Sequence, residues 1–111
     1  MKIRIGLGID VHKLSENKKL FIGGSEIPHY KGCVAHSDGD FLIHAICDAL
    51  LGAAGLRDIG TYFPDNDTAY KDIDSKILLK KTADIISQQG WKISNIDTVI
   101  CLEKPKIKDY V

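Results

Sequence analysis

The sequence predicts an α/β (α+β) domain in which a sheet carries helices packed on one of its faces. Three observations predict this class. One segment alternates in hydrophobicity like a β-strand and another is mostly apolar like a central strand, two others have the apolar spacing of helices, and a hairpin pattern lies between the first strand and the first helix. The 111 residues contain no linker, repeat or low-complexity segment, so residues 1–111 are expected to form a single domain.

The first predicted strand covers residues 3–12. One face consists of branched aliphatic side chains and is expected to be buried: Ile3, Ile5, Leu7, Ile9 and Val11. The opposite face carries Arg4, Gly6, Gly8, Asp10 and His12. Because residues two apart on a strand point the same way, Asp10 and His12 should emerge side by side. The two glycines leave this face bare, which is typical of a place where something approaches the backbone closely.

A short hairpin and a helix are predicted next. Leu20-Phe21-Ile22 and Glu26-Ile27-Pro28 flank Gly23-Gly24-Ser25, a composition typical of a hairpin. From Phe41 to Leu56 the apolar spacing becomes helical, with one wide stripe: Leu42, Ala45, Ile46, Ala49, Leu50 and Ala53. Ser37 or Asp38 is the expected N-cap, and Asp40 in the first turn suits the helix dipole.

The second half of the chain predicts a loop, a helix and a strand. Residues 57–73 are rich in Gly, Pro, Asp and Asn and are expected to form a long ordered loop. The helix that follows should be capped by Asp74 or Ser75 and stop at Gly90, with a buried face of Leu78, Ile85 and Ile86. Residues 91–102, mostly apolar in their second half, predict a central strand.

Composition limits the classes of function. Lys plus Arg equals Asp plus Glu at 15 each, so no overall field favours a nucleic acid or membrane partner, and neither is expected. The longest apolar stretch, residues 49–56, is too short to cross a bilayer, and the alternating N-terminus lacks a signal-peptide core. Cys33, Cys47 and Cys101 show no C-x-x-C spacing and are predicted to be reduced thiols in a cytoplasmic protein.

One histidine of the first predicted helix, His44, is followed one turn later by Asp48. Taken alone, His44 is better explained as a half-buried core histidine bonded to Asp48, whereas Asp10 with His12 is equally a solvent-facing strand end. Together, two imidazoles and one carboxylate form the ligand set of a catalytic zinc site whose fourth position is open to substrate. In this interpretation, Asp48 accepts a hydrogen bond from the His44 ring.

The segment His36-Ser37-Asp38-Gly39-Asp40 stands at the predicted start of the first helix. Unpaired backbone N–H groups there would bind an anion, with further donors from His36 and Ser37; the alternative is a plain capping segment. In the loop that follows, Asp58 is a candidate acceptor for ribose hydroxyls. The acids at 65, 67 and 72 are equally explained as turn formers, and Lys104-Pro105-Lys106 as a charged strand end.

The combined motifs resemble a known family. D-V-H at 10–12, A-H-S-D-G-D at 35–40, H-A-I-C-D-A-L-L-G-A-A at 44–54, D-I-G at 58–60 and F-P-D-N-D at 63–67 resemble the 2-C-methyl-D-erythritol 2,4-cyclodiphosphate synthase family. The resemblance implies metal ligands at Asp10, His12 and His44, and a catalytic His36 that stabilises the transition state. It implies substrate contacts by Asp10, His12, His36, Ser37, Asp58, Ile59, Gly60, Phe63, Pro64, Asp65, Asn66, Asp67, Leu102, Glu103, Lys104, Pro105, Lys106, Ile107 and Lys108.

The activity that the resemblance implies is that of a phosphorus–oxygen lyase in the non-mevalonate isoprenoid pathway. Its members convert 4-diphosphocytidyl-2-C-methyl-D-erythritol 2-phosphate to the 2,4-cyclodiphosphate and release CMP, by metal-assisted intramolecular phosphoryl transfer. The implied cofactors are Zn²⁺, or another divalent transition metal, at the three ligands, and Mg²⁺ or Mn²⁺ bridging substrate phosphates. The implied assembly is a homotrimer with sheets facing its interior and active sites between subunits, so that residues 102–108 form a neighbour's cytosine pocket.

One departure from the family and two alternative functions stand beside this interpretation. Family members carry a Thr-Thr-x-Glu segment that supplies a phosphate contact and a magnesium ligand, and this sequence lacks it. We therefore expect the C-terminal part to be incomplete and the biological protein to be longer. The alternatives are a zinc phosphohydrolase, whose product would be inorganic phosphate, and an inactive metal-binding fragment.

Overall fold

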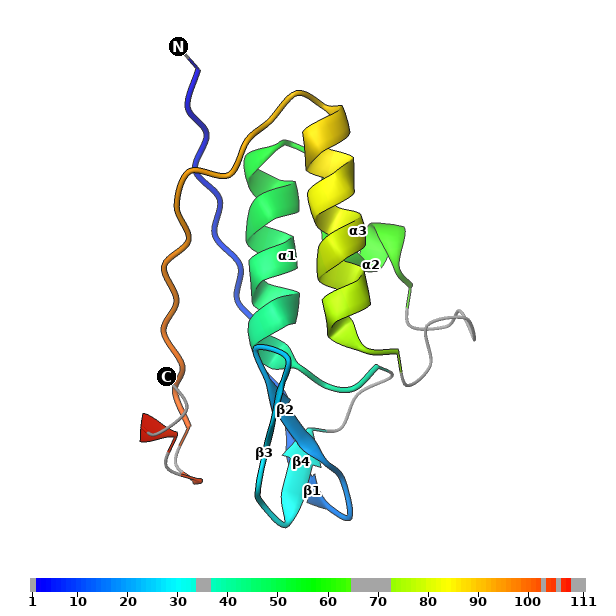
Figure 1. The fold of residues 1–111 in the computed structure, drawn as a ribbon, viewed down its shortest axis with the longest axis vertical. Coiled ribbons are helices and arrows are strands. Elements are labelled where there is room, and N and C mark those ends of the chain that lie inside the picture. Colours follow the sequence, from blue (N-terminus) through cyan, green and yellow to red (C-terminus); the bar gives the residue numbers. More distant parts are fainter. Residues whose placement is uncertain (1, 34–36, 65–72, 103, 106, 109–111) are drawn as a thin grey trace.

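In the computed structural model, the chain is an α+β domain in which two small antiparallel sheets lie at one end of a pair of helices (Figure 1). The structure describes residues 2–33, 37–64, 73–102, 104–105 and 107–108. The elements in chain order are β1 (Leu14–Glu16), β2 (Leu20–Ile22), β3 (Ser25–Ile27), β4 (Lys31–Cys33), α1 (Phe41–Ala53), α2 (Ile59–Tyr62) and α3 (Ser75–Gln88). The α+β class is confirmed. The single sheet covered by helices is wrong, because the described strands form two separate two-stranded sheets.

The predicted hairpin is confirmed as the β2–β3 pair, with Leu20 opposite Ile27. Its two-residue turn is Gly23-Gly24, with φ angles of 60° and 84°, the left-handed conformation that both central residues of a type I′ turn require. The other pair, β1–β4, is also antiparallel. Apolar side chains from both pairs form one core cluster: Leu20, Ile22, Ile27 and Cys33.

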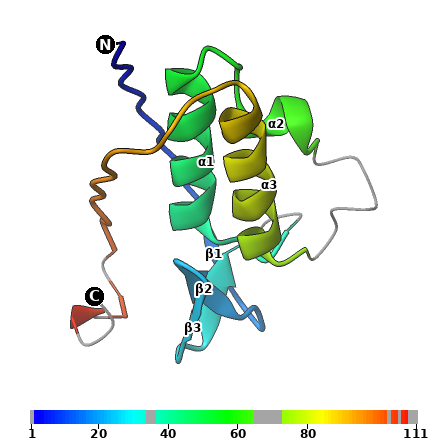
Figure 2. The same ribbon diagram turned by 45° about the horizontal axis from the view of Figure 1, so that its top comes forward.

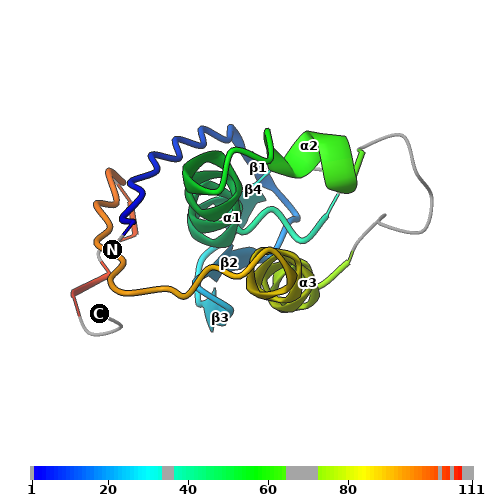
Figure 3. The same ribbon diagram turned by 90° about the horizontal axis from the view of Figure 1, so that it is seen from above.

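Helices α1 and α3 lie side by side and run in the same direction, so both begin next to the strands (Figure 1, Figure 2). The most buried residues of α1 are Ile43, Cys47 and Leu51, four residues apart on one face. The predicted stripe of α1, including Ala45 and Ala49, is only partly buried and lies on other faces. The predicted face is wrong because α1 is covered on two sides, by α3 and by the N-terminal segment (Figure 3).

Both helix starts differ in detail from the prediction. The N-cap of α1 is Asp40, whose carboxylate accepts a hydrogen bond from the Ile43 N–H, so the expected caps at Ser37 or Asp38 are wrong. The N-cap of α3 is Asp74, as predicted, and Gly90 follows that helix with φ of 84°. On α3, Leu78 and Ile86 are buried as predicted, Ile85 is partly buried, and Ser75 and Thr82 are also buried.

The N-terminal segment (residues 2–13) is extended but contributes no strand to either sheet. Its aliphatic face is exposed, against expectation: Ile5 is 92% and Val11 86% exposed. The opposite face packs on α1, because a Cβ atom on Gly6 would lie 1.9 Å from the Ala49 carbonyl oxygen and one on Gly8 1.8 Å from that of Ala45. The predicted close approach is therefore confirmed, and the partner is the backbone of a helix.

The C-terminal segment (residues 91–102) is also extended and forms no described strand, so the predicted central strand is wrong. The Arg4 guanidinium lies 4.9 Å from the centre of the Trp91 ring, a cation–π contact that joins the two extended segments. Val99 is 87% exposed, whereas Ile100 and Leu102 are partly buried against the core cluster of the sheets. The hydrophobic residues of this segment predicted a strand, but no described strand pairs with it.

Two further features concern the cysteines and the length of the helices. Cys33, Cys47 and Cys101 are all free thiols, the first two of them buried. Among the helices of the described residues, none combines the length and hydrophobicity that a membrane span requires. Within the predicted loop 57–73, the structure adds the short helix α2; residues 65–72 lie outside the described part.

Candidate metal centre

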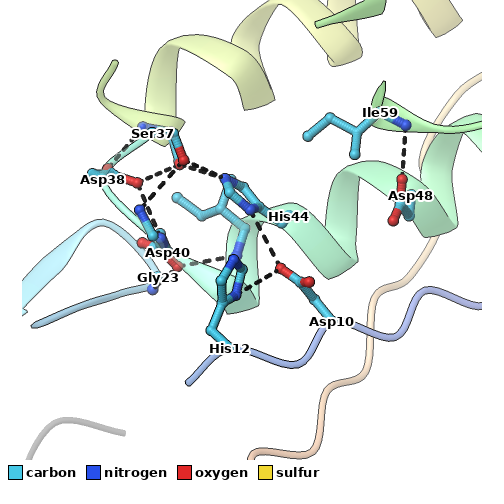
Figure 4. Close-up of polar contacts among 12 residues, drawn as sticks. Asp10, His12, Gly23, Ser37, Asp38, Asp40, His44, Asp48 and Ile59 are labelled. Atoms are coloured by element: carbon cyan, nitrogen blue, oxygen red, sulfur yellow. Dashed lines mark hydrogen bonds and ion pairs between the residues drawn. The ribbon is translucent and has the colours of Figure 1, made fainter. Parts of the chain in front are cut away.

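The three predicted metal ligands meet where the N-terminal segment passes the first turn of α1 (Figure 4). The Nδ1 atoms of His12 and His44 each lie 3.3 Å from Oδ2 of Asp10. One potential ligand atom from each residue lies within 4.8 Å of the others. The side chains keep 14–23% of their surface exposed, so the cluster lies close to the protein surface. Asp10 and His12 do emerge side by side, as the sequence predicted.

The unpaired atoms of this cluster fit a metal ion. Oδ2 of Asp10 and Nδ1 of His12 are buried and face each other at 3.3 Å, but neither has a hydrogen-bond partner among the described residues. Leaving such groups unpaired costs roughly 1–3 kcal/mol each, a cost that coordination to a cation removes. One carboxylate and two imidazoles are the three protein ligands of a catalytic tetrahedral site. The residues therefore suit a divalent metal ion with one position open.

The far side of the His44 ring is held by two hydroxyl groups. Nε2 of His44 lies 3.0 Å from Oγ of Ser37 and 3.0 Å from Oγ of Ser75. The Ser75 hydroxyl donates to Oδ1 of Asp38 at 2.5 Å, and the Ser75 N–H donates to Oδ2 at 2.9 Å. Sequence reasoning treated Ser75 only as a possible helix cap, because it lies 31 positions after His44, too far for a local signal.

Asp48 does not hold the His44 ring, so that prediction is wrong. Its Oδ1 accepts a hydrogen bond of 2.8 Å from the Ile59 N–H and thereby ties α1 to α2. Burial raises the pKa of Asp48 above its ordinary value, and the Ile59 N–H opposes this only in part. Asp48 faces away from the cluster in the direction of α2 (Figure 4). Its role is to fix the start of α2.

The start of α1 is less open to an anion than the sequence suggested. The Gly39 N–H donates to Oγ of Ser37, the Asp40 N–H to Oδ1 of Asp38, and the Ile43 N–H to Oδ1 of Asp40. These backbone donors are already paired, so the plain-capping alternative describes this part of the backbone better. The fully buried Asp40 carboxylate also accepts from the N–H groups of Gly23 and Gly24, at 2.9 and 2.6 Å, and so ties the hairpin to α1.

The predicted ribose contact, Asp58, is exposed at the start of α2. Its Oδ1 accepts hydrogen bonds from the hydroxyl and the N–H of Thr61, at 2.8 and 3.0 Å, and these bonds lower the pKa of the carboxyl group. The carboxylate is therefore ionised at neutral pH and ready to accept hydrogen bonds from a ligand. Ile59 and Gly60 follow it in α2, and Phe63 is buried just after.

The remaining predicted substrate residues divide into two groups. Several lie outside the described residues: His36, Asp65, Asn66, Asp67, Glu103 and Lys106. Of the others, Leu102 and Ile107 pack against the core cluster of the sheets, Lys104 and Lys108 are exposed, and Pro64 and Pro105 are partly buried.

The buried thiols are not alternative reactive groups. Burial raises the pKa values of Cys33 and Cys47 to about 11, so both remain protonated at neutral pH. The carboxylates near Cys33, first Asp40, raise its pKa further. Neither thiol lies in the Asp10, His12 and His44 cluster. Among the described residues, the cluster of Asp10, His12 and His44 is therefore the candidate functional site.

The chain is similar to known proteins in family, sequence and structure. The model of the YgbB family matches residues 3–111. The chain is 58% identical over 111 residues to the 2-C-methyl-D-erythritol 2,4-cyclodiphosphate synthase of Bacteroides fragilis (strain YCH46). The aligned residues are all of this chain and 70% of that protein. Two solved structures are also similar. The bifunctional IspDF of Campylobacter jejuni has a TM-score of 0.93 and 44% identity, over 98% of this chain and 30% of that one. A CDP-bound 2C-methyl-D-erythritol-2,4-cyclodiphosphate synthase has a TM-score of 0.90 and 40% identity, over 96% and 71%.

Proposed function

The chain belongs to the YgbB family, and from that premise we propose that it catalyses the reaction for which its relatives are named. It converts 4-diphosphocytidyl-2-C-methyl-D-erythritol 2-phosphate to 2-C-methyl-D-erythritol 2,4-cyclodiphosphate and releases CMP. The observation that carries this proposal is the cluster of Asp10, His12 and His44. The sequence similarity to a 2-C-methyl-D-erythritol 2,4-cyclodiphosphate synthase supports it. The resemblance drawn from the motifs is confirmed at the level of the family.

The reaction is an intramolecular phosphoryl transfer. An oxygen of the 2-phosphate forms a bond to the β-phosphorus, the bond from that phosphorus to the oxygen bridging toward cytidine breaks, and CMP leaves with that oxygen. The protein has little covalent work in such a step: it folds the substrate into a ring-closing geometry and neutralises phosphoryl charge. Asp10, His12 and His44 would hold a zinc ion, which would supply positive charge for a phosphoryl oxygen.

The chain's own polar groups bind and orient the substrate. The Ser37 hydroxyl, beside the His44 ring, contacts a phosphate, and His36 stabilises the transition state. The exposed carboxylate of Asp58 accepts hydrogen bonds from the ribose hydroxyls, with Gly60 next to it. Its ionised state and its fixed position at the start of α2 support this assignment. For the bridging Mg²⁺ or Mn²⁺, the described residues offer no second cluster of three ligands, so no step is assigned to that ion.

The proposed assembly is a homotrimer in which residues 102–108 of one subunit complete the cytosine pocket of the next. The exposed aliphatic face of the N-terminal segment supports burial against another copy, because large apolar side chains in a row are rarely left in water. A CDP-bound relative supports a cytidine nucleotide as ligand. Sedimentation of the full-length protein tests the trimer, and a monomer at micromolar concentration would overturn it.

Product analysis separates this function from its alternatives. The full-length protein, loaded with zinc and magnesium, should turn the diphosphocytidyl substrate into cyclic diphosphate and CMP, which phosphorus NMR and chromatography detect. Inorganic phosphate as the product would favour a zinc phosphohydrolase, and no product would favour an inactive metal-binding protein. His44→Ala should lose most of its zinc and its turnover. His29→Ala is the matched control, because that ring makes a tilted contact with Tyr30 instead of joining the cluster.

A further inference from the structure

The Ser75 hydroxyl joins the candidate metal centre to the first turn of α3. Ser75 is fully buried, and its Oγ lies 3.0 Å from Nε2 of His44 and 2.5 Å from Oδ1 of Asp38. The Ser75 N–H donates to the other oxygen of Asp38 at 2.9 Å. The Asp38 carboxylate therefore accepts hydrogen bonds from both the backbone and the side chain of Ser75. Because Asp74 is the N-cap of α3, helix capping explains neither the contact of the Ser75 hydroxyl with His44 nor its hydrogen bond to Asp38.

The direction of each proton follows from the chemistry of these groups. A hydroxyl has one proton to donate, whereas a carboxylate only accepts. The Ser75 proton is given to Asp38, so Oγ of Ser75 can meet His44 only as an acceptor. Nε2 of His44 must then carry a proton, and Nδ1 of the neutral ring keeps its lone pair. Nδ1 is the atom that lies 3.3 Å from Oδ2 of Asp10 in the cluster.

We propose that Ser75 is a positioning residue for His44: backed by Asp38, it fixes the ring in the Nε2–H tautomer and presents Nδ1 as the metal ligand. Ser37 adds a second acceptor on the same nitrogen, but its hydroxyl has no carboxylate to take its proton in the described residues. Only the Ser75–Asp38 pair therefore excludes the opposite tautomer. Partners of this kind typically change metal affinity by roughly 10–100-fold.

The variant Ser75→Ala isolates this role. Alanine keeps the backbone N–H that bonds to Asp38, and it is well tolerated in the first turn of a helix already capped by Asp74. The matched control is Thr82→Val, which removes another fully buried hydroxyl from the same helix. Asp38→Asn is a second variant, because a side-chain amide that donates to Ser75 frees the hydroxyl proton for His44.

The inference rests on the proposed metal site, and the first measurement is chosen to be independent of it. Nitrogen-15 correlation spectra of the metal-free protein, taken where the spectra themselves show a neutral His44 ring, report which of its nitrogens is protonated. We expect Nε2–H in the wild type and a mixture of tautomers in Asp38→Asn. A wild-type ring protonated at Nδ1 would overturn the inference, whatever the protein binds.

The second measurement is zinc affinity by competition with a chelator. Ser75→Ala should bind zinc roughly tenfold more weakly than the wild type, whereas Thr82→Val should match the wild type. Equal affinity of Ser75→Ala and the wild type, or an equal loss in both variants, would overturn the positioning role. A wild type that binds no zinc would overturn the proposed metal site instead, and the spectra would still decide the tautomer.

Discussion

Two regions of this molecule, the compact part and the N-terminal segment, place their apolar side chains in opposite environments. In the compact part (residues 14–33, 37–64 and 73–90), aliphatic side chains meet each other, and Leu20 is only 1% exposed. In the N-terminal segment, an equally regular set of aliphatic side chains faces solvent, and Ile5 is 92% exposed. The glycine-bearing face of the same segment is packed on α1 and carries two of the three candidate metal ligands.

The difference teaches what a period-2 pattern specifies. Alternation sets which side chains share a face of an extended chain, and that part of the prediction holds for the N-terminal segment. It does not set which face is covered, because cover depends on the surface that the segment meets. Here the surface is the alanine-rich side of α1, which only a face without side chains can approach. The face that carries two candidate metal ligands is therefore also the packed face.

The largest contrast between the two regions should appear in a pair of truncations. Leu20→Ala should lower the free energy of unfolding by about 2–5 kcal/mol, because it leaves a cavity in the core of the sheets. Ile5→Ala should change it by less than about 0.5 kcal/mol in dilute monomer, because the side chain is already in water. Urea denaturation measures both. A cost for Ile5→Ala as large as that for Leu20→Ala would mean that the exposed face is buried within one chain.

The next effect should come from the buried carboxylate that holds the compact part together. Asp40→Ala removes the cap of α1 and leaves three N–H groups without their acceptor, those of Gly23, Gly24 and Ile43. The free energy of unfolding should fall by roughly 2–4 kcal/mol. Asp40→Asn, which keeps one acceptor, should lose less. A loss of stability smaller than about 0.5 kcal/mol, as expected for a surface substitution, would contradict the role of Asp40.

A substitution at the junction between the two regions should affect both stability and metal binding. The methyl group of Gly8→Ala would collide with the backbone of α1 and push the N-terminal segment away, at a cost of about 1–3 kcal/mol. Zinc affinity should fall with it, because Asp10 and His12 lie on the same face. The control is Gly52→Ala on α1, which has open space around it and should raise stability by about 0.5–1 kcal/mol. Unchanged zinc affinity in Gly8→Ala would separate the packed face from the metal centre.

The smallest expected effect depends on pH. The pKa of Asp48 is raised by burial, so the folded state holds this proton more tightly than the unfolded chain does. Stability present below the unfolded pKa of 3.8 is therefore lost as the pH rises through the folded pKa. Asp48→Asn keeps an acceptor for the Ile59 N–H and avoids that loss. Its stability relative to wild type should increase from pH 3.5 to pH 7, roughly the window set by carboxyl titration; a decrease would contradict the sign.

Local signals predicted the elements whose partners are near in sequence. The Gly23-Gly24 turn, the Asp74 cap and the stop at Gly90 each depend on a few neighbouring residues, and all three are confirmed. The strands at 3–12 and 91–102 were wrong because pairing depends on distant backbone groups. Likewise, the cluster of Asp10, His12 and His44 followed from residue types and spacing. The contacts from Ser75 to His44 and from Asp48 to Ile59 have no local sequence signal.

The central claim is that the packed face of the N-terminal segment and α1 together build one metal centre. X-ray absorption at the zinc edge of the zinc-loaded protein tests it directly, because sulfur and imidazole ligands give distinct distances. We predict two imidazole nitrogens and carboxylate oxygen at about 2.0–2.2 Å and no sulfur near 2.3 Å. In His44→Ala, one imidazole or the zinc itself should be lost. A sulfur shell, which Cys33, Cys47 or Cys101 would have to supply, or a zinc ion without imidazole, would contradict the account.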